Sequence, residues 1–299
     1  MTTPPFLQPG DKVAVVAPAR SITFDEVYPA MKILQRWGLE VVLGTHVFGR
    51  CDQYSGTDEQ RAHDLQNALD DNTIRAVICA RGGYGTVRII DRIDFRGFMA
   101  RPKWIVGYSD ITVLHAHIHR NYAIETLHAT MPVNMKEDSP AESLESLRNV
   151  LFGAKISYTL PVAPLNLPGE GEGELVGGNL SILCSLIGSS SMPDTSGKIL
   201  FIEDVDEYLY HIDRMMMALK RAGKLEQLQG LIVGGMDRMN DNAVPFGKNS
   251  YQIIAEAVKE AAYPVCFGFP AGHGAKNLAL IMGRKVRMKI DKRVEIGFL

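Results

Sequence analysis

Residues 104–114 read WIVGYSDITVL, an apolar run rich in β-branched residues followed by a helix-like apolar pattern. Such a run is typical of a buried strand that ends near Gly107 and turns sharply into a helix. Ser109 then lies on the corner, where its hydroxyl is exposed at the carboxyl edge of the sheet and the first helical amides point at whatever it attacks. Hydrolases present a serine nucleophile in this way. The alternative is that Ser109 only caps the helix, because Ser and Asp are preferred at that position.

Strands and helices alternate on both sides of this corner. Apolar runs predict buried strands at residues 12–19, 39–43, 75–80, 103–108 and 124–129. A capping box at residues 57–60 predicts a helix to about residue 69, and Pro29 indicates that the preceding helix begins only there. Short strands that alternate with helices indicate βαβ units and a parallel sheet. We therefore expect an α/β domain with a parallel sheet, carrying Ser109, over residues 1–160.

The pattern changes after residue 132. A helix near residues 141–151 leads into residues 160–173, whose Pro and Gly content is typical of a crossing between domains. Beyond it we expect strands at residues 174–176, 198–203 and 231–236, helices at 208–222 and 250–262, and an antiparallel tail over 278–298. The sequence thus predicts a second, mixed α/β domain over residues 161–299.

The composition is that of an ordinary globular protein. The 299 residues are 46% apolar and 22% charged, and their net charge is −2, so we expect neither nucleic acid nor a membrane surface as a partner. We see no secretory signal and no apolar run long enough to span a bilayer. The four cysteines are far apart and three lie in apolar runs, which indicates reduced packing residues and a cytoplasmic protein.

A glycine-rich loop, Arg81-Gly82-Gly83-Tyr84-Gly85, follows one expected strand and precedes a helix. Glycines at such a corner let backbone N–H groups approach a ligand oxygen closely. If Ser109 is a nucleophile, this loop can supply half of an oxyanion hole and the Asp110 amide the other half. A dinucleotide-binding loop is disfavoured, because the spacing is not G-x-G-x-x-G. A plain tight turn is the other alternative.

A nucleophilic serine needs a base, and the base needs an orienting carboxylate. His273 is a candidate base on a glycine-flanked loop after an expected strand at residues 264–269. Glu203 is a candidate carboxylate, because a charge at the end of a buried strand is costly unless it is paired or functional. Ordinary alternatives stand beside both: a loop histidine can serve turn geometry, and Glu203 can share a helix-capping role with Asp204 and Asp206.

The other histidines give weaker signals. On a helix only His115 and His119 of the run His115, His117 and His119 share a face, and no carboxylate completes an H-E-x-x-H pattern. We therefore expect them on a half-buried helix face and expect no metal site. His128, at a strand end, is a weaker candidate for the base.

Together these motifs resemble the LD-carboxypeptidase family of serine peptidases, and the resemblance covers nearly the whole chain. The matching stretches are PGDKVAVVAPA, YSGTDEQRAHDLQNAL, ARGGYGTVRIID, VGYSDITVLH, ELVGGNLSIL, ILFIEDVDEYLYHIDRMM and GFPAGHGAKNLALIMG. The chain departs from the family at residues 17–19, which read APA where A-P-S is usual, and at residues 129–132, which read ATMP where G-P-M is usual.

The resemblance implies a site and an activity. Ser109 is expected to be the nucleophile, Glu203 the triad carboxylate and His273 the base, with the backbone amides of Gly83 and Asp110 as the oxyanion hole. The implied reaction cleaves the L,D-amide bond to the terminal D-alanine of cytoplasmic murein tetrapeptides during peptidoglycan recycling, without cofactor or metal. The implied fold is an N-terminal Rossmann-like domain and a C-terminal swivelling α/β domain, usually in a homodimer.

Two alternative functions stay open. A microcin-immunity-type peptidase of the same family cleaves a peptide-nucleotide, and such members tend to carry an added aromatic loop; the sequence shows no insertion between Asp206 and Tyr210. A catalytically silent module that binds a ligand with the glycine-rich loop is the alternative from another class.

Overall fold

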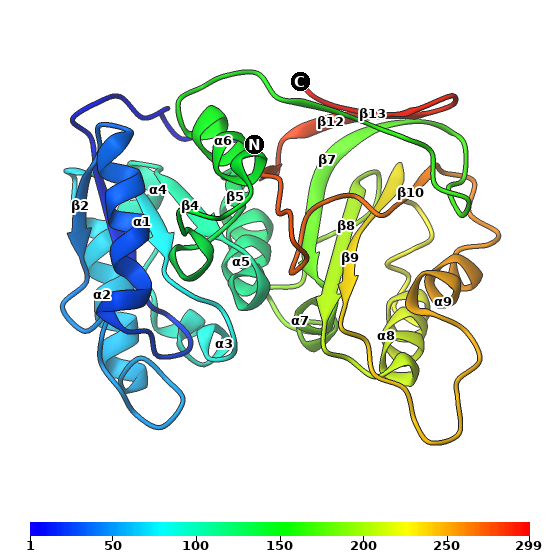
Figure 1. Ribbon diagram of the computed structural model, residues 1–299, viewed down its shortest axis with the longest axis horizontal. Coiled ribbons are helices and arrows are strands. Elements are labelled where there is room, and N and C mark those ends of the chain that lie inside the picture. Colours follow the sequence, from blue (N-terminus) through cyan, green and yellow to red (C-terminus); the bar gives the residue numbers. More distant parts are fainter.

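Two β-sheets lie side by side in the computed structural model, which describes residues 1–299 (Figure 1). The first sheet has the strand order β11-β5-β4-β3-β1-β2. Its parallel strands are β1 (Lys12–Val16), β2 (Glu40–Leu43), β3 (Ile74–Cys79), β4 (Trp104–Gly107) and β5 (Thr126–His128). The sixth strand, β11 (Leu280–Met282), pairs with β5 in the antiparallel sense.

Helices cover both faces of this first sheet. Successive residues of a buried strand point to opposite faces, so its apolar side chains pack against helices on both sides. Val13 and Val15 pack in one core with α1 (Phe24–Arg36) and α6 (Ala141–Leu151). Ala14 and Val16 pack in the other core with helices α2, α4 and α5. These helices are α2 (Asp58–Asp70), α4 (Arg96–Ala100) and α5 (Thr112–Tyr122); the short elements are α3 (Thr86–Ile89), η1 (Ile90–Arg92), η2 (Ser109–Ile111) and η3 (Pro132–Asn134).

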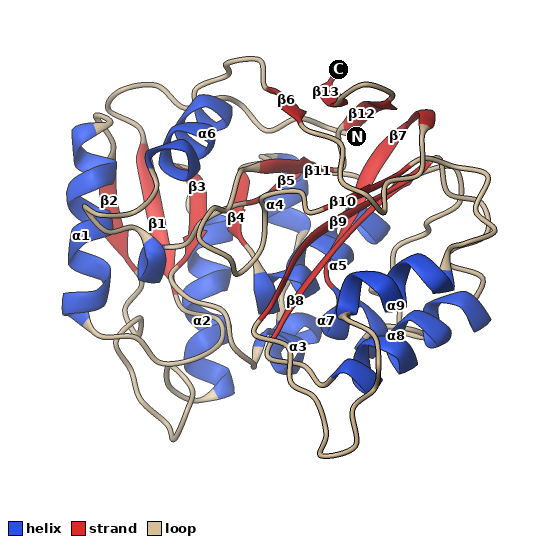
Figure 2. Ribbon diagram, turned by 45° about the vertical axis from the view of Figure 1, so that its right-hand side comes forward, coloured by secondary structure: helices blue, strands red, loops and turns tan.

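The second sheet has seven strands in the order β10-β9-β8-β7-β12-β13-β6. The parallel strands are β7 (Gly169–Asn179), β8 (Ile199–Val205), β9 (Gly230–Asp237) and β10 (Val265–Phe267). The antiparallel strands are β12 (Lys285–Ile290), β13 (Val294–Phe298) and β6 (Ser157–Leu160). Helices α7 (Leu180–Ser185), α8 (Leu209–Arg221) and α9 (Ser250–Ala257) lie together on one side of the sheet (Figure 2).

The two halves are interlocked by the path of the chain. Strand β6 forms the outer edge of the second sheet, and β11 returns to the first sheet before β12 and β13 complete the second. A hydrogen bond also joins the halves: the Asn179 amide at the end of β7 donates to Thr112 Oγ1 at the start of α5, at 2.9 Å. Strand β6 lies before the predicted division at residue 160, yet it belongs to the second sheet. The division itself stays a prediction.

The expected α/β fold, a Rossmann-like N-terminal sheet followed by a mixed α/β part, is confirmed, but the first sheet is not purely parallel because β11 joins it in the antiparallel sense. The prediction that Pro29 delays the first helix is wrong. Helix α1 begins at Phe24, because Thr23 and Glu26 form a capping box that satisfies the first amides. Pro29 lies within α1 and leaves the Asp25 carbonyl without its helical donor, but Asp25 is exposed and water can serve it.

The stretch at residues 160–173, predicted as a crossing between domains, already contains the start of a strand. Strand β7 begins at Gly169, and its first part pairs with β12. A Cβ on Gly171 would overlap the Gln229 carbonyl oxygen, so this glycine permits close strand approach and does not mark a loop. No helix of the structure is both long and apolar enough to cross a membrane.

Candidate active site

Ser109 sits on a strained corner between β4 and α5. Its φ is +63°, in the left-handed region that serine seldom adopts. Two glycines make the corner possible: a Cβ on Gly107 would lie 2.8 Å from Ile111 Cγ1, and a Cβ on Gly82 would lie 2.9 Å from Ser109 Cβ and 3.1 Å from its Oγ. The glycine-rich loop therefore lies directly against the Ser109 hydroxyl.

Buried polar side chains fix this loop and the corner to each other. The Asp110 carboxylate accepts a hydrogen bond from the Thr86 amide at 2.8 Å, which ties the corner to the start of α3. The Arg61 guanidinium, buried under the loop, donates to the carbonyls of Pro18 and Gly85. Burial raises the pKa of Asp110. Arg61 was missed by the sequence analysis, because only the fold brings α2 beneath the loop.

His273 and Glu203 form a hydrogen-bonded pair at the carboxyl edge of the second sheet. Glu203 lies in β8, its side chain fully buried, and its Oε2 accepts a hydrogen bond from His273 Nδ1 at 2.7 Å. Gly272 has a φ of +122°, and a Cβ there would lie 2.8 Å from Glu203 Oε2. The glycine before His273 is thus required for the close approach of this loop to the carboxylate.

The Glu203 carboxylate also sets the charge state of the imidazole. Burial disfavours the charged form of His273, but the hydrogen bond and the negative charge of Glu203 outweigh burial, so the pKa of His273 lies above its ordinary value. A carboxylate on Nδ1 leaves Nε2 as the nitrogen free to exchange a proton with a ligand. Nδ1 therefore carries the hydrogen in the bond to Glu203.

The capping alternative for Glu203 is not what the structure shows. Helix α8 begins after Tyr208 without a side-chain cap. Asp204 instead accepts hydrogen bonds from the side-chain amide of Asn179 and the backbone amide of Ser181, each at 2.9 Å, which anchors β8 to the start of α7. Burial and the neighbouring Glu203 raise the pKa of Asp204 to about 7.

The loop that carries His273 is docked onto helix α6 of the first half. The Asn277 side chain accepts from the Gly272 amide at 3.0 Å, and the Asn277 amide donates to Ser143 Oγ at 2.9 Å. The Ala279 amide donates to Ser146 Oγ at 3.0 Å. Sequence analysis missed these serines, since nothing in a helical pattern signals a partner more than a hundred residues away.

One cleft of about 470 Å³ between the halves contains the main candidates. Ser109, Gly83 and His273 line it, and Glu203 lies behind His273. Asp110 does not line the cleft, but its amide lies beside Gly82. The ring of Tyr108 packs edge-on at 4.8 Å from the ring of His273. Ser109 and His273 share the cleft without a hydrogen bond between them.

The histidines of α5 have structural roles, and the prediction that they are half-buried is wrong because His115, His117 and His119 are all buried. His115 Nε2 donates to the Gly107 carbonyl at 2.9 Å, and His119 Nε2 contacts Thr126 Oγ1 at 2.9 Å. Burial lowers the pKa of His115 to about 4, so it stays neutral. His128 is fully buried against the rings of Tyr108 and Phe201 and does not line the cleft.

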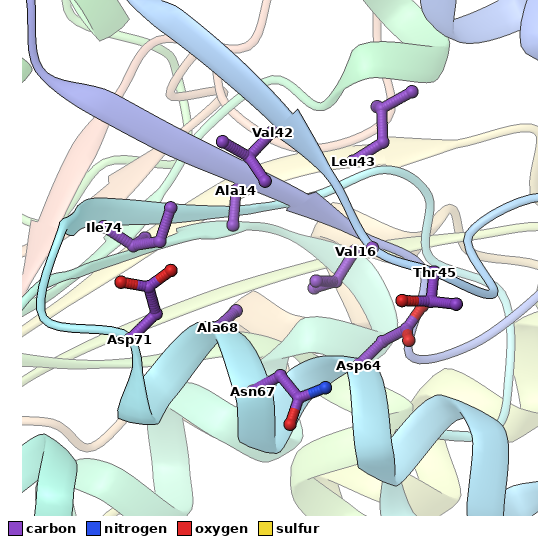
Figure 3. A pocket seen from close by; sticks show the side chains of 11 residues that line it. Ala14, Val16, Val42, Leu43, Thr45, Asp64, Asn67, Ala68, Asp71 and Ile74 are labelled. Carbon is purple, nitrogen blue, oxygen red and sulfur yellow. The ribbon is translucent and has the colours of Figure 1, made fainter.

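A separate cluster could accept a metal ion. Ligand atoms of His46, His63 and Asp64 lie within 4.8 Å of one another, and His46 Nδ1 is hydrogen-bonded to Asp64 Oδ1 at 2.9 Å. Asp64 also lines a small pocket of about 160 Å³ between the β1–β2 edge and α2 (Figure 3). This pocket shares no lining residue with the cleft, so the cluster lies outside the candidate active site.

With this geometry in place, comparison with known proteins identifies the class. Residues 13–129 match the LD-carboxypeptidase N-terminal domain, and residues 172–288 match the LD-carboxypeptidase C-terminal domain. The chain therefore belongs to the LD-carboxypeptidase family, which confirms the resemblance noted in the sequence.

Individual relatives agree with this placement. The chain is 36% identical to a probable murein peptide carboxypeptidase of Bacillus subtilis, over 98% of this chain and 93% of that protein. It is 27% identical to the microcin C7 self-immunity protein MccF of Escherichia coli, over 93% of this chain and 89% of that protein. The crystal structure of a muramoyltetrapeptide carboxypeptidase from Oxalobacter formigenes superimposes with a TM-score of 0.88 at 26% identity, covering 96% of this chain and 98% of that one.

Proposed function

We propose that this protein is a serine carboxypeptidase that removes the terminal D-alanine from murein tetrapeptides by cleaving an L,D-amide bond. One observation carries the proposal: His273, hydrogen-bonded to the buried Glu203, shares a cleft with the left-handed Ser109, beside a glycine-rich loop. Nucleophile, base and orienting carboxylate are the parts that acyl transfer needs. The names of the murein-peptide relatives support the substrate class.

In the proposed mechanism, Ser109 Oγ attacks the carbonyl carbon of the scissile amide while His273 Nε2 takes the hydroxyl proton. The oxyanion forms against the amides of Gly83 and Asp110. His273 then gives its proton to the leaving nitrogen, and D-alanine departs. Water attacks the acyl-enzyme, with His273 again taking the proton, and Ser109 is released.

The proposed roles of Glu203 and the strained corner follow from their contacts. Glu203 holds His273 by Nδ1 and stabilises the imidazolium that forms when Nε2 accepts a proton. The left-handed corner keeps the Ser109 hydroxyl against Gly82 of the glycine-rich loop, which supports the proposed role of this loop as an oxyanion donor.

A microcin-immunity peptidase is the second candidate, supported by the similarity to MccF. The relevant connection is short here: β8 ends at Val205 and α8 begins at Leu209, which leaves no room for an inserted aromatic loop at that point. This feature favours a murein peptide over a peptide-nucleotide as the substrate. A silent binding module is a further alternative, and labelling of Ser109 by a serine-directed phosphonate separates it from an enzyme.

Mass spectrometry of the purified protein incubated with murein tripeptide, tetrapeptide and pentapeptide tests the proposal. We expect conversion of tetrapeptide to tripeptide with release of D-alanine. The pentapeptide should be a poor substrate, because its terminal bond joins two D residues. Comparable release from the pentapeptide, or cleavage of a peptide-nucleotide alone, would argue against the proposed substrate.

Two further parts of the proposal come from the family resemblance. We place the reaction in the cytoplasm and expect a homodimer. Cell fractionation and sedimentation, at twice the 33.0 kDa mass of one chain, are the measurements that check them.

A further inference from the structure

Two arginines that line the cleft have no anionic partner. Arg20 follows β1 in the first half, and Arg238 follows β9 in the second half, so they approach the cleft from opposite halves. Both are exposed and neither forms an ion pair, whereas the third arginine of the cleft, Arg81, pairs with Glu26 at 3.4 Å. Asp206 is the only carboxylate lining the cleft, and its Oδ1 accepts a hydrogen bond from Asn240. The cleft therefore has an excess of positive charge.

Arg20 is placed beside the proposed oxyanion hole by a glycine. Gly83 has a φ of +108°, and a Cβ there would overlap Cγ and Cδ of Arg20, so the stem of this arginine lies directly across the glycine-rich loop. The Arg20 amide also donates to the Gly82 carbonyl at 3.3 Å. Since Gly82 touches Ser109, the Arg20 side chain lies over the same short loop that contacts the nucleophile.

Arg238 is held on the opposite rim in a strained conformation. Its φ is +51°, and the facing Asp206 has a φ of +59° and donates its amide to the Asp237 carbonyl at 3.0 Å. Left-handed backbone at a residue other than glycine is strained and is concentrated at functional sites. Arg238 lines the same cleft as Tyr108 and His273, whose rings pack against each other. Arg238 thus shares this cleft with the proposed base.

We propose that Arg20 and Arg238 together bind the terminal carboxylate of the peptide, an inference that rests on the proposed function. In a substrate cut at its last amide bond, the free carboxylate lies one residue, about 3.3–3.6 Å of chain, beyond the attacked carbonyl. A guanidinium binds a carboxylate through two parallel N–H···O bonds. A peptide that continues past this point, or ends in an amide, has no charge to offer there. The pair therefore selects chain ends over internal bonds.

The test compares two peptides that differ only in this charge: murein tetrapeptide with its free carboxylate, and the same peptide with a terminal carboxamide. We expect wild-type protein to favour the free acid. Arg20→Gln and Arg238→Gln should each lose on the order of 10- to 100-fold in kcat/KM for the acid, with little change for the amide. Arg101→Gln, which removes an exposed, unpaired arginine outside the cleft, should leave both values unchanged.

Unfolding curves for each variant, and a lysine substitution at each position, separate recognition from stability. Arg→Lys keeps the charge without the bidentate geometry and should fall between wild type and Gln. Equal losses for acid and amide, or a wild-type protein that does not distinguish them, would overturn the carboxylate assignment while leaving the carboxypeptidase proposal intact.

Calorimetric titration of both peptides into Ser109→Ala protein measures the same preference without turnover. Suppose that the wild-type protein cleaves neither peptide, that the free acid nevertheless binds more tightly than the amide, and that Arg20→Gln abolishes this difference. That outcome would contradict the proposed function and leave the arginine pair standing. Binding without acid selectivity would contradict the arginine pair.

Discussion

Ser109 keeps a backbone conformation that costs on the order of 1–3 kcal/mol, and its neighbours explain why the cost persists. Gly82 and Gly107 lack the Cβ atoms that would block the corner, and the Asp110 carboxylate holds the Thr86 amide on its far side. The strain therefore has a structural source in the surrounding residues, and its effect is to present one hydroxyl to the cleft.

The first prediction concerns the imidazole and its carboxylate. We expect His273→Ala to reduce kcat by on the order of 10⁴ or more, because members of a triad act as a unit. Glu203→Gln should reduce kcat by a smaller factor, about 100-fold or more, because the imidazole ring loses its orienting charge. Steady-state release of D-alanine measures both. Asp64→Asn is the matched control, since it alters another buried carboxylate bonded to a histidine, outside the cleft. Retention of more than a tenth of the activity in His273→Ala would remove His273 from the mechanism.

The second prediction is a pH profile. Only neutral His273 can act as the base, and its pKa lies above the ordinary value of about 6.5, so kcat/KM should fall as pH drops through a midpoint above that value. In Glu203→Gln the charge of the partner is gone while burial persists, so the midpoint should move to lower pH. A midpoint that the substitution leaves unchanged would assign the titration to another group.

At the scale of elements, the loop carrying His273 depends on helix α6 as much as on its own strand. The hydroxyl oxygens of Ser143 and Ser146 accept hydrogen bonds from the backbone amides of Asn277 and Ala279, and all four residues are buried. Replacing either serine by alanine leaves an amide without its acceptor.

The third prediction follows from those bonds. Ser143→Ala and Ser146→Ala should each lower the free energy of unfolding by about 1–3 kcal/mol, measured by urea denaturation. Ser185→Ala removes an exposed hydroxyl from α7 and should stay within about 0.5 kcal/mol. Equal effects in all three proteins would show that α6 does not support the loop.

The elements also show what sequence can and cannot predict. The apolar runs and the corner at Ser109 located the five parallel strands of the first sheet, because buried parallel strands leave a strong local signal. Strand β11 was predicted in the second domain, because its pairing with β5 joins distant segments. The prediction from Pro29 was wrong, because the capping box at Thr23 stabilises the start of the helix by more than the one missing helical hydrogen bond costs. Arg61 and Ser143 were out of reach, because their importance arises from contacts between segments that only the fold brings together.

At the scale of the whole molecule, the sheets exchange strands across the boundary. Strand β11 comes from the second half of the chain but pairs with β5 of the first sheet. In addition, Thr112 in α5 accepts a hydrogen bond from the backbone amide of Asn179 in β7. The proposed catalytic residues come from both halves, with Ser109 in one and the Glu203–His273 pair in the other. A motif search finds each residue, but the shared cleft depends on this interlocking.

The fourth prediction is that the two halves unfold together. Because β6 and β11 link the sheets, differential scanning calorimetry should show one transition whose van't Hoff and calorimetric enthalpies agree. Thr112→Val, which leaves the buried Asn179 amide unpaired, should lower the stability by about 1–3 kcal/mol without splitting the transition. Two resolved transitions in the wild-type protein would mean that the halves are independent.

The most direct test of the central claim is D-alanine release from murein tetrapeptide by wild-type and Ser109→Ala protein under identical conditions, with intact-mass analysis of the quenched enzyme. We predict release by the wild type, a tripeptide acyl group on Ser109 when the reaction is trapped, and activity lower by on the order of 10⁴ or more in the variant. Undiminished release by Ser109→Ala protein, with no acyl group on the enzyme, would contradict the account.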